Sequence, residues 1–298
     1  MKKALAILTL LFIVSLVPTS YAADKMKIGV TLHPYYSWVK NIVEDRAEVI
    51  PLIPVDADPH SYQPQGADIE MIKSLNMVVV NGMGHDTFLP GMLKAADRTD
   101  IDEINVNEGL PLIKSHSSGE GDAVVYNSHT YISIVAATQQ ISRLASELGK
   151  RNPENADFFR KNASAYNKKL RMMLADALGK IKSANIKNLR IATVHDGYDY
   201  LMQDLGIEVA AVIQPRHGIE PNPKQLADTI KRLKAANVNV LFTEVDYEKK
   251  YTDIIEKEAG VKVYKLSHIS NGPYSADHFE KYISGNIAEI LKAVSNAQ

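Results

Sequence analysis

Three histidines lie where the sequence pattern ends a strand or begins a helix, and imidazole is the commonest metal ligand among protein side chains. His60 follows Pro59 in a loop rich in turn residues, His129 precedes a helical segment, and His195 directly follows an apolar strand. The chain contains no cysteine, so any metal site must use His, Asp, Glu or weaker oxygen ligands. We therefore expect these three histidines to meet around a divalent metal.

Four other histidines have simpler interpretations. His116 lies in a stretch rich in Ser and Gly, which predicts an exposed loop and a solvated side chain. His33, His85 and His278 have aromatic or apolar neighbours in the sequence, so each is expected to be a packing or surface residue and not a ligand.

The element that would position the three candidate ligands is a long helix in the middle of the chain. Asn152 can cap its start, Pro153 suits the first helical position, and Glu154 and Asp157 favour the positive end of the helix dipole. Apolar side chains then recur at helical spacing on one face, at Phe159, Ala163, Tyr166, Leu170, Met173, Leu174, Ala177 and Ile181. Such a helix would be about 45 Å long, which is longer than a small domain is wide. We therefore expect residues 152–185 to form a rigid backbone that links two lobes.

Strand and helix patterns alternate on both sides of this linking helix. In residues 23–151, strand patterns over Lys27–Thr31, Ala47–Ile53 and Met77–Val80 are separated by helical segments, and in residues 186–298 a strand followed by a helix occurs repeatedly. This alternation predicts an α/β fold with two lobes, each built on a mainly parallel sheet flanked by helices.

Polar residues follow the predicted strands of the second lobe. His195, Glu244 and the pair Ser267 and His268 each stand at the carboxyl end of a strand. In parallel sheets, ligands bind beyond these strand ends, so the four residues would lie along one rim of the sheet.

The first residues have the features of a secretory signal peptide. Two lysines precede an apolar stretch from Ala4 to Val17, and small residues stand at Ser20 and Ala22, which predicts cleavage after Ala22. The apolar stretch is shorter than the roughly 20 residues that a membrane span needs. Because no cysteine follows, we expect residues 1–22 to be removed and the mature chain to be a periplasmic protein without a lipid anchor.

The composition limits the kinds of partner. The 34 lysines and arginines nearly balance the 35 aspartates and glutamates, which gives no electrostatic reason to expect nucleic acid or anionic lipid. The absence of cysteine also excludes disulfides, and the length suffices for two domains with their own cores. We expect a monomer.

Five motifs, found in the same order along the chain, make it similar to the solute-binding proteins of zinc and manganese ABC transporters, the cluster A-I type. They resemble the family patterns D-P-H-x-[YF]-[EQ]-P, N-G-x-G-x-[ED]-x-[WF]-L, H-x-[AS]-[FY]-x-Y, E-P-[ST]-P and I-F-x-E, and they occupy Asp58–Pro64, Asn81–Leu89, Thr193–Tyr200, Gly218–Pro223 and Val240–Glu244. Each motif is weak alone, but together they cover essentially the whole mature chain.

The resemblance implies two α/β lobes joined by a rigid helix, with a metal bound in the cleft and handed to an ABC-type membrane permease. His60, His129 and His195 fall on the first three ligand positions of the family. Manganese-type members tend to carry a carboxylate at the position of His195, and imidazole suits zinc better than manganese. High-affinity capture of Zn²⁺ as the transported ion is therefore the main expectation, with Mn²⁺ or Fe²⁺ binding by the same fold as the alternative.

The sequence departs from the family at the fourth ligand. Ser267 stands where the family has an aspartate, so His268 or, alternatively, Glu244 would supply the fourth ligand. Without that aspartate, neutral imidazoles leave the charge of the ion uncompensated, which gives importance to nearby carboxylates at Asp58, Asp86, Asp196 and Glu244. The histidine-rich loop typical of the family is reduced to His116.

Two other classes of protein share some of these features. A zinc hydrolase also uses three histidines and an open position, with Glu244 as the candidate base, but no H-E-x-x-H motif occurs. An adhesin role is less expected because the lipidation cysteine is missing.

Overall fold

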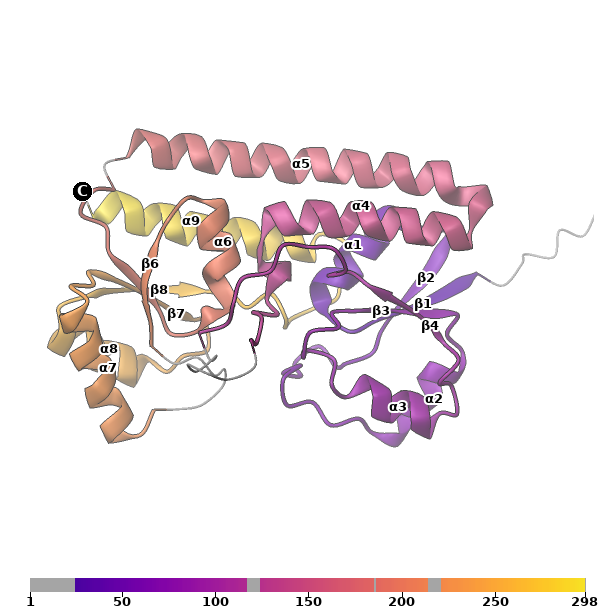
Figure 1. The fold of residues 1–298 in the computed structure, drawn as a ribbon, viewed down its shortest axis with the longest axis horizontal. Helices are drawn as coiled ribbons and strands as arrows, with labels where there is room; N and C mark the ends of the chain where they lie inside the picture. The colour runs from indigo at the N-terminus through magenta and orange to yellow at the C-terminus, as the bar shows by residue number, and fades with distance from the viewer. Residues whose placement is uncertain (1–24, 117–123, 185, 214–220, 298) are drawn as a thin grey trace, which may run out of the picture.

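Two parallel sheets lie side by side beneath one long helix in the computed structural model of the chain (Figure 1). The structure describes residues 25–116, 124–184, 186–213 and 221–297. The expected signal peptide lies outside the described residues, as does part of the motif at Gly218–Pro223. Within the described ranges, every helix is too short or too polar to cross a membrane.

The first sheet has four parallel strands in the order β2-β1-β3-β4. These are β1 (Met26–Val30), β2 (Ala47–Pro51), β3 (Met77–Val80) and β4 (Asp102–Asn105), with helices α1 (His33–Val43), α2 (Gly66–Lys73) and α3 (Leu89–Ala95) between them. The sequence patterns predicted the first three strands but did not predict β4 or α3. The strand β4 begins with two exposed acidic residues, and the short helix α3 contains Pro90 and Gly91, so neither has a clear pattern.

The second sheet repeats this order as β6-β5-β7-β8, again with all strands parallel. It contains β5 (Ile191–Thr193), β6 (Val209–Val212), β7 (Val240–Glu244) and β8 (Lys262–Leu266), and its helices are α6 (Asp199–Asp204), α7 (Pro223–Ala235), α8 (Lys249–Ala259) and α9 (His278–Asn296). In each sheet the strand order reverses beside the first strand. Such a reversal opens a crevice at the carboxyl ends of the strands, where ligands bind in this kind of fold.

One continuous hydrophobic core runs through both lobes. It joins the helix α1, the helix α4 (Ile134–Arg151), α6 and α9 to the long helix α5 (Ala156–Ser183), through buried side chains such as Trp38, Ile141, Phe159, Leu201 and Ile283. The other face of each sheet has its own smaller core, under α2 and α3 in the first lobe and under α7 and α8 in the second. The shared core fixes the lobes against each other.

The long helix α5 confirms the prediction of a helix that links the lobes. It has 28 residues and packs against α1 and α4 of the first lobe and against α9 of the second lobe. It begins at Ala156, later than expected, because Asn152 ends α4 and a 3₁₀ turn at Pro153–Asn155 follows. The expected apolar face is partly buried, with Phe159, Leu170 and Ala177 almost fully enclosed.

A second connection between the lobes is the loop from β8 to α9. The Tyr274 hydroxyl donates a hydrogen bond to the carbonyl oxygen of Ile53 at 2.9 Å, and the Gly272 N–H donates to the carbonyl oxygen of Val55 at 2.9 Å. Both acceptors lie in the loop that follows β2. The lobes are therefore held together both along α5 and beside the strand ends.

Candidate metal site

Histidines from both lobes gather at the facing strand ends. Among the described residues, the ligand atoms of one group all lie within 4.8 Å of one another, and this group consists of His60, His85, His129 and His268. The Nε2 atom of His195 lies 3.0 Å from the Nε2 atom of His129 and adds a fifth imidazole. The structure thus brings together the four histidines proposed from the sequence and places one more beside them.

His85 is the member that sequence reasoning missed. It was expected to be a packing or surface residue, but its ring lies 4.4 Å from the ring of His60 and 4.6 Å from that of His129, and it is completely buried. It occupies a variable position of the Asn81–Leu89 motif, which therefore gave no signal. The feature of the sequence that could have indicated a role for His85 in the site was its position shortly after the end of β3.

Asn127 orients His129. Its side-chain oxygen accepts hydrogen bonds from the backbone N–H of His129 at 3.0 Å and from Nδ1 of the ring at 2.8 Å, and its amide group donates to the carbonyl oxygen of Asp196 at 2.7 Å. An amide oxygen only accepts, so Nδ1 carries the proton and the lone pair of Nε2 is directed at the cluster. Burial, and then the neighbouring histidines, hold the pKa of His129 well below its usual value, which keeps the ring neutral.

Asn127 and Ser128 stand just before the helical segment that follows His129, where the type of either residue would suit a helix cap. The segment after His129 first forms a 3₁₀ turn at Thr130–Ile132, and the helix α4 starts only at Ile134. Its cap is Ser133, whose hydroxyl oxygen accepts a hydrogen bond from the N–H of Ala136 at 2.9 Å. Neither Ser128 nor Asn127 caps this helix.

Two buried carboxylates accompany the imidazoles. Asp196 Oδ1 lies 3.3 Å from Nδ1 of His195, and Asp196 Oδ2 accepts a hydrogen bond from the hydroxyl of Ser115 at 2.7 Å. Glu244, at the end of β7, has a carboxylate oxygen within 4.8 Å of ligand atoms of His195 and His268. Asp196 is 3% exposed and Glu244 is 7% exposed. Their two negative charges balance the two positive charges of a divalent cation. A buried site made only of neutral imidazoles would stabilise such a cation less well.

His268 reaches the cluster because the chain turns sharply after β8. Asn286 holds both backbone groups of Ser267, accepting from its N–H at 2.7 Å and donating to its carbonyl oxygen at 2.8 Å. The Ser267 hydroxyl accepts from the N–H of Ile269, which adopts a left-handed φ of 61°. Ser267 is therefore used in the turn, and His268 is buried against the other histidines.

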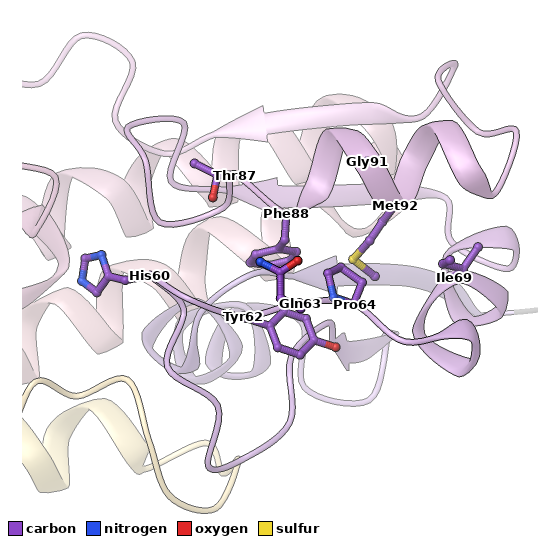
Figure 2. A pocket seen from close by; sticks show the side chains of 9 residues that line it. All are labelled: His60, Tyr62, Gln63, Pro64, Ile69, Thr87, Phe88, Gly91 and Met92. Carbon is purple, nitrogen blue, oxygen red and sulfur yellow. The ribbon is translucent and has the colours of Figure 1, made fainter. Parts of the chain in front are cut away.

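His60 is the exposed member of the group. The Asp58 carboxylate accepts hydrogen bonds from the backbone N–H of His60 and from the hydroxyl of Ser61, both at 3.0 Å, and so shapes the loop. Figure 2 shows His60 apart from the other side chains that line a hollow of about 400 Å³, among which Tyr62 and Phe88 meet edge to face. His60 thus lines this hollow and also contacts the buried rings of His85 and His129.

The remaining histidines of the described chain lie away from the cluster. His116 is half exposed, and its Nε2 lies 3.1 Å from Asp199 Oδ2. Burial raises the pKa of Asp199 to about 6, an effect that His116 opposes. His33 stacks on the ring of Tyr274, and His278 contacts His33, so both are packing residues as expected.

The site combines neutral imidazoles, two carboxylates and little exposure to water. Nitrogen-rich donors of this kind bind divalent first-row transition metals, and a buried position at the junction of two lobes suits capture of an ion. The fold and the site together define a two-lobed metal-binding protein.

Comparison with known proteins assigns the chain to one family. A family model described as zinc-uptake complex component A, periplasmic, matches residues 28–293. The chain therefore belongs to the substrate-binding proteins of metal ABC transporters, which confirms the resemblance seen in the sequence. The members are solute-binding proteins and not enzymes, which sets the hydrolase alternative aside.

The similar proteins are named for, or were solved with, different metals. The chain is 25% identical over 252 residues to the high-affinity zinc uptake system protein ZnuA of Bacillus subtilis, a match that covers 82% of this chain and 78% of the relative. It is 44% identical to the substrate-binding protein FpvC of Pseudomonas aeruginosa. The FpvC structure with Mn²⁺ has a TM-score of 0.86 and covers 92% of this chain and 100% of the other. The FpvC structure with Ni²⁺ has a TM-score of 0.84 and covers 92% and 98%.

Proposed function

We propose that this protein captures Zn²⁺ outside the cytoplasm and delivers it to an ABC-type membrane permease. His60, His129, His195 and His268 are the proposed ligands, with Glu244 as an alternative to His268. The observation that carries this proposal is the grouping of imidazoles from both lobes, three of them buried, within 4.8 Å of one another. Such a site exists only when the lobes face each other, as capture between lobes requires.

The chemistry of the donors supports zinc over manganese. Imidazole suits zinc, whereas manganese favours carboxylate, carbonyl and water oxygens. Four imidazoles would complete the four-coordinate arrangement that zinc usually takes in proteins. The zinc-uptake description of the matching family model and the name of the Bacillus subtilis relative agree with this choice.

A second candidate is an ion that accepts more than four ligands, such as Ni²⁺, Fe²⁺ or Mn²⁺. The fifth imidazole, from His85, and the carboxylate of Glu244 favour it, because together they exceed the donors that tetrahedral zinc uses. The relative at 44% identity was also solved with Ni²⁺ and with Mn²⁺.

The proposed setting is the periplasm, reached by means of the signal peptide expected at residues 1–22. We propose that the mature chain acts there as a monomer. The buried cluster would keep the ion until the permease displaces the loops around His60 and His268.

A metal competition experiment tests the proposal. The mature protein is stripped of metal and offered equimolar Zn²⁺, Ni²⁺, Mn²⁺ and Fe²⁺ without oxygen, and the retained metals are measured by mass spectrometry. About one Zn²⁺ per chain is expected, in agreement with a single site. Retention of Ni²⁺, Fe²⁺ or Mn²⁺ instead would favour the second candidate, and retention of none would contradict metal capture.

A further inference from the structure

A tyrosine hydroxyl connects two of the imidazoles. The Oη atom of Tyr131 lies 3.1 Å from Nε2 of His85 and 3.1 Å from Nδ1 of His268. Tyr131 is completely buried in the 3₁₀ turn that follows His129. Because the rings of His85 and His268 come from different lobes, this hydroxyl joins the two halves of the site.

The hydroxyl has one proton to donate to two nitrogen atoms. The phenol of a tyrosine is neutral near pH 7, because its ordinary pKa is about 10. When its O–H donates to Nε2 of His85, the oxygen can accept Nδ1–H from His268. The Nε2 atom of His268 then keeps its lone pair for a metal, whereas His85 carries its own proton on Nδ1 and has no lone pair left.

The reverse arrangement exchanges the two rings. When the O–H of Tyr131 donates to Nδ1 of His268, the proton of that neutral ring must be on Nε2, which removes it as a ligand. His85 then donates Nε2–H to the phenol and has a lone pair on Nδ1. If both rings instead donated to Oη, the phenol O–H would lose its acceptor inside a buried site, which is costly.

We propose that Tyr131 is a positioning residue that makes His85 and His268 alternative ligands, so that the captured ion never receives both. This inference rests on the proposed metal capture and deepens it. With three imidazoles from His60, His129 and His195, one further imidazole gives the total of four that zinc prefers. Tyr131 thereby selects against ions that would use all five imidazoles.

Other polar groups near the two rings agree with this assignment. The hydroxyl of Ser270 lies 3.1 Å from Nδ1 of His268 and can accept the same N–H that Tyr131 accepts. Two hydroxyl groups can therefore accept Nδ1–H of His268, in the form of the ring that keeps its lone pair on Nε2. His268 is therefore the preferred fourth ligand, and His85 is the ring held in reserve.

The test replaces Tyr131 by phenylalanine, which keeps the ring and removes the hydroxyl. Co²⁺ is the probe, because four-coordinate Co²⁺ absorbs visible light strongly and six-coordinate Co²⁺ weakly. The unsubstituted protein should give the strong absorption. Y131F should give weaker bands, and its ratio of Ni²⁺ to Zn²⁺ affinity should rise about tenfold, in the range found for partners of metal ligands.

A double variant separates this role from a merely structural one. In Y131F/H85A only four imidazoles remain, so the strong absorption and the original affinity ratio should return. The matched control is Tyr166→Phe, which removes a buried hydroxyl bonded to Glu280, away from the cluster. It should leave the Co²⁺ spectrum unchanged.

A single variant covers the case in which Y131F does not fold. H85A should bind Zn²⁺ within about tenfold of the unsubstituted protein if His85 is only the reserve ligand, and far more weakly if it always binds the ion. An unchanged spectrum and affinity ratio in Y131F, or a large loss of Zn²⁺ affinity in H85A, would overturn the inference while leaving metal capture intact. Failure of the unsubstituted protein to bind either Co²⁺ or Zn²⁺ would instead contradict the proposed function and the inference with it.

Discussion

The Nε2 atoms of His129 and His195 lie 3.0 Å apart, although the two rings come from opposite lobes. Asn127 directs the lone pair of His129 Nε2 into this contact, and Asp196 lies beside the other nitrogen of His195. Two nitrogen atoms at this distance must share a proton or a cation. The lobes therefore already stand in the position that lets both rings bind one ion.

The first prediction concerns which histidines bind the ion. His195→Ala should lower Zn²⁺ affinity by more than about 100-fold, the upper range for residues that merely support a ligand. His116→Ala should have almost no effect, because this ring is half exposed and pairs with Asp199 away from the cluster. Isothermal titration with a competing chelator measures both. Similar losses in the two variants would contradict the ligand assignment.

The second prediction concerns the support of His129 by Asn127. Asn127→Ala removes the acceptor for Nδ1–H and the contact with Asp196, so Zn²⁺ affinity should fall about 10- to 100-fold with no ligand removed. Asn167→Ala is the matched control, since its amide is also buried but donates to Thr138 and Ser142. An affinity loss as large in the control would show that a general loss of packing is responsible.

The third prediction uses the space beside Gly197. A methyl group at this position would lie 2.9 Å from the ring of His195 and 3.3 Å from that of His129, so both rings would have to move. Gly197→Ala should therefore weaken Zn²⁺ binding by about tenfold. Gly179→Ala, in the open on α5, should leave binding unchanged and favour the helix. Equal Zn²⁺ affinity in the two variants would show that the rings tolerate the displacement.

Much of the fold was predictable from the sequence because the patterns that indicate strands and helices are local. The apolar run Met77–Val80 has the predicted bounds in the structure. The long apolar face of α5 likewise predicted the helix that links the lobes. The start of this helix was misjudged because Asn152 and Asn155 are both good caps, and only packing decides that Asn152 ends α4.

The site was predictable only in part. His60 and His195 lie in motifs, and His129 precedes a helical segment. The placement of His268, in contrast, depends on a left-handed backbone at Ile269, which a β-branched residue rarely adopts. His85 enters the cluster through the pairing of β1 and β3 and the turn after β3, which bring a variable motif position to the centre. Contacts between distant segments, including the one through Tyr131, leave no pattern along the chain.

The fourth prediction concerns the stability of the metal-free protein in acid. Burial, and then His278, lower the pKa of His33 to about 3, whereas the unfolded chain titrates near 6.5. Between these values the unfolded state binds the extra proton, so the free energy of unfolding falls as pH falls, by at most about 1.4 kcal/mol per pH unit from this group. His33→Phe keeps a ring against Tyr274 and should flatten this dependence.

Urea unfolding of the metal-free protein from pH 7 to pH 4 measures that slope. Ser284→Ala serves as control, because it removes an exposed hydroxyl that does not titrate in this range and should leave the slope unchanged. A slope in His33→Phe equal to that of the unsubstituted protein would place the acid sensitivity in other groups.

The last prediction is that the lobes do not open widely when the ion leaves. The shared core along α5 and the hydrogen bonds of Tyr274 and Gly272 to the loop after β2 resist rotation of one lobe against the other. Small-angle scattering should therefore give nearly equal radii of gyration with and without metal. Hydrogen exchange should instead rise in the loop that carries His60, which is the exposed member of the cluster. A clear increase in radius on metal removal would show that these connections act as a hinge and not as a clamp.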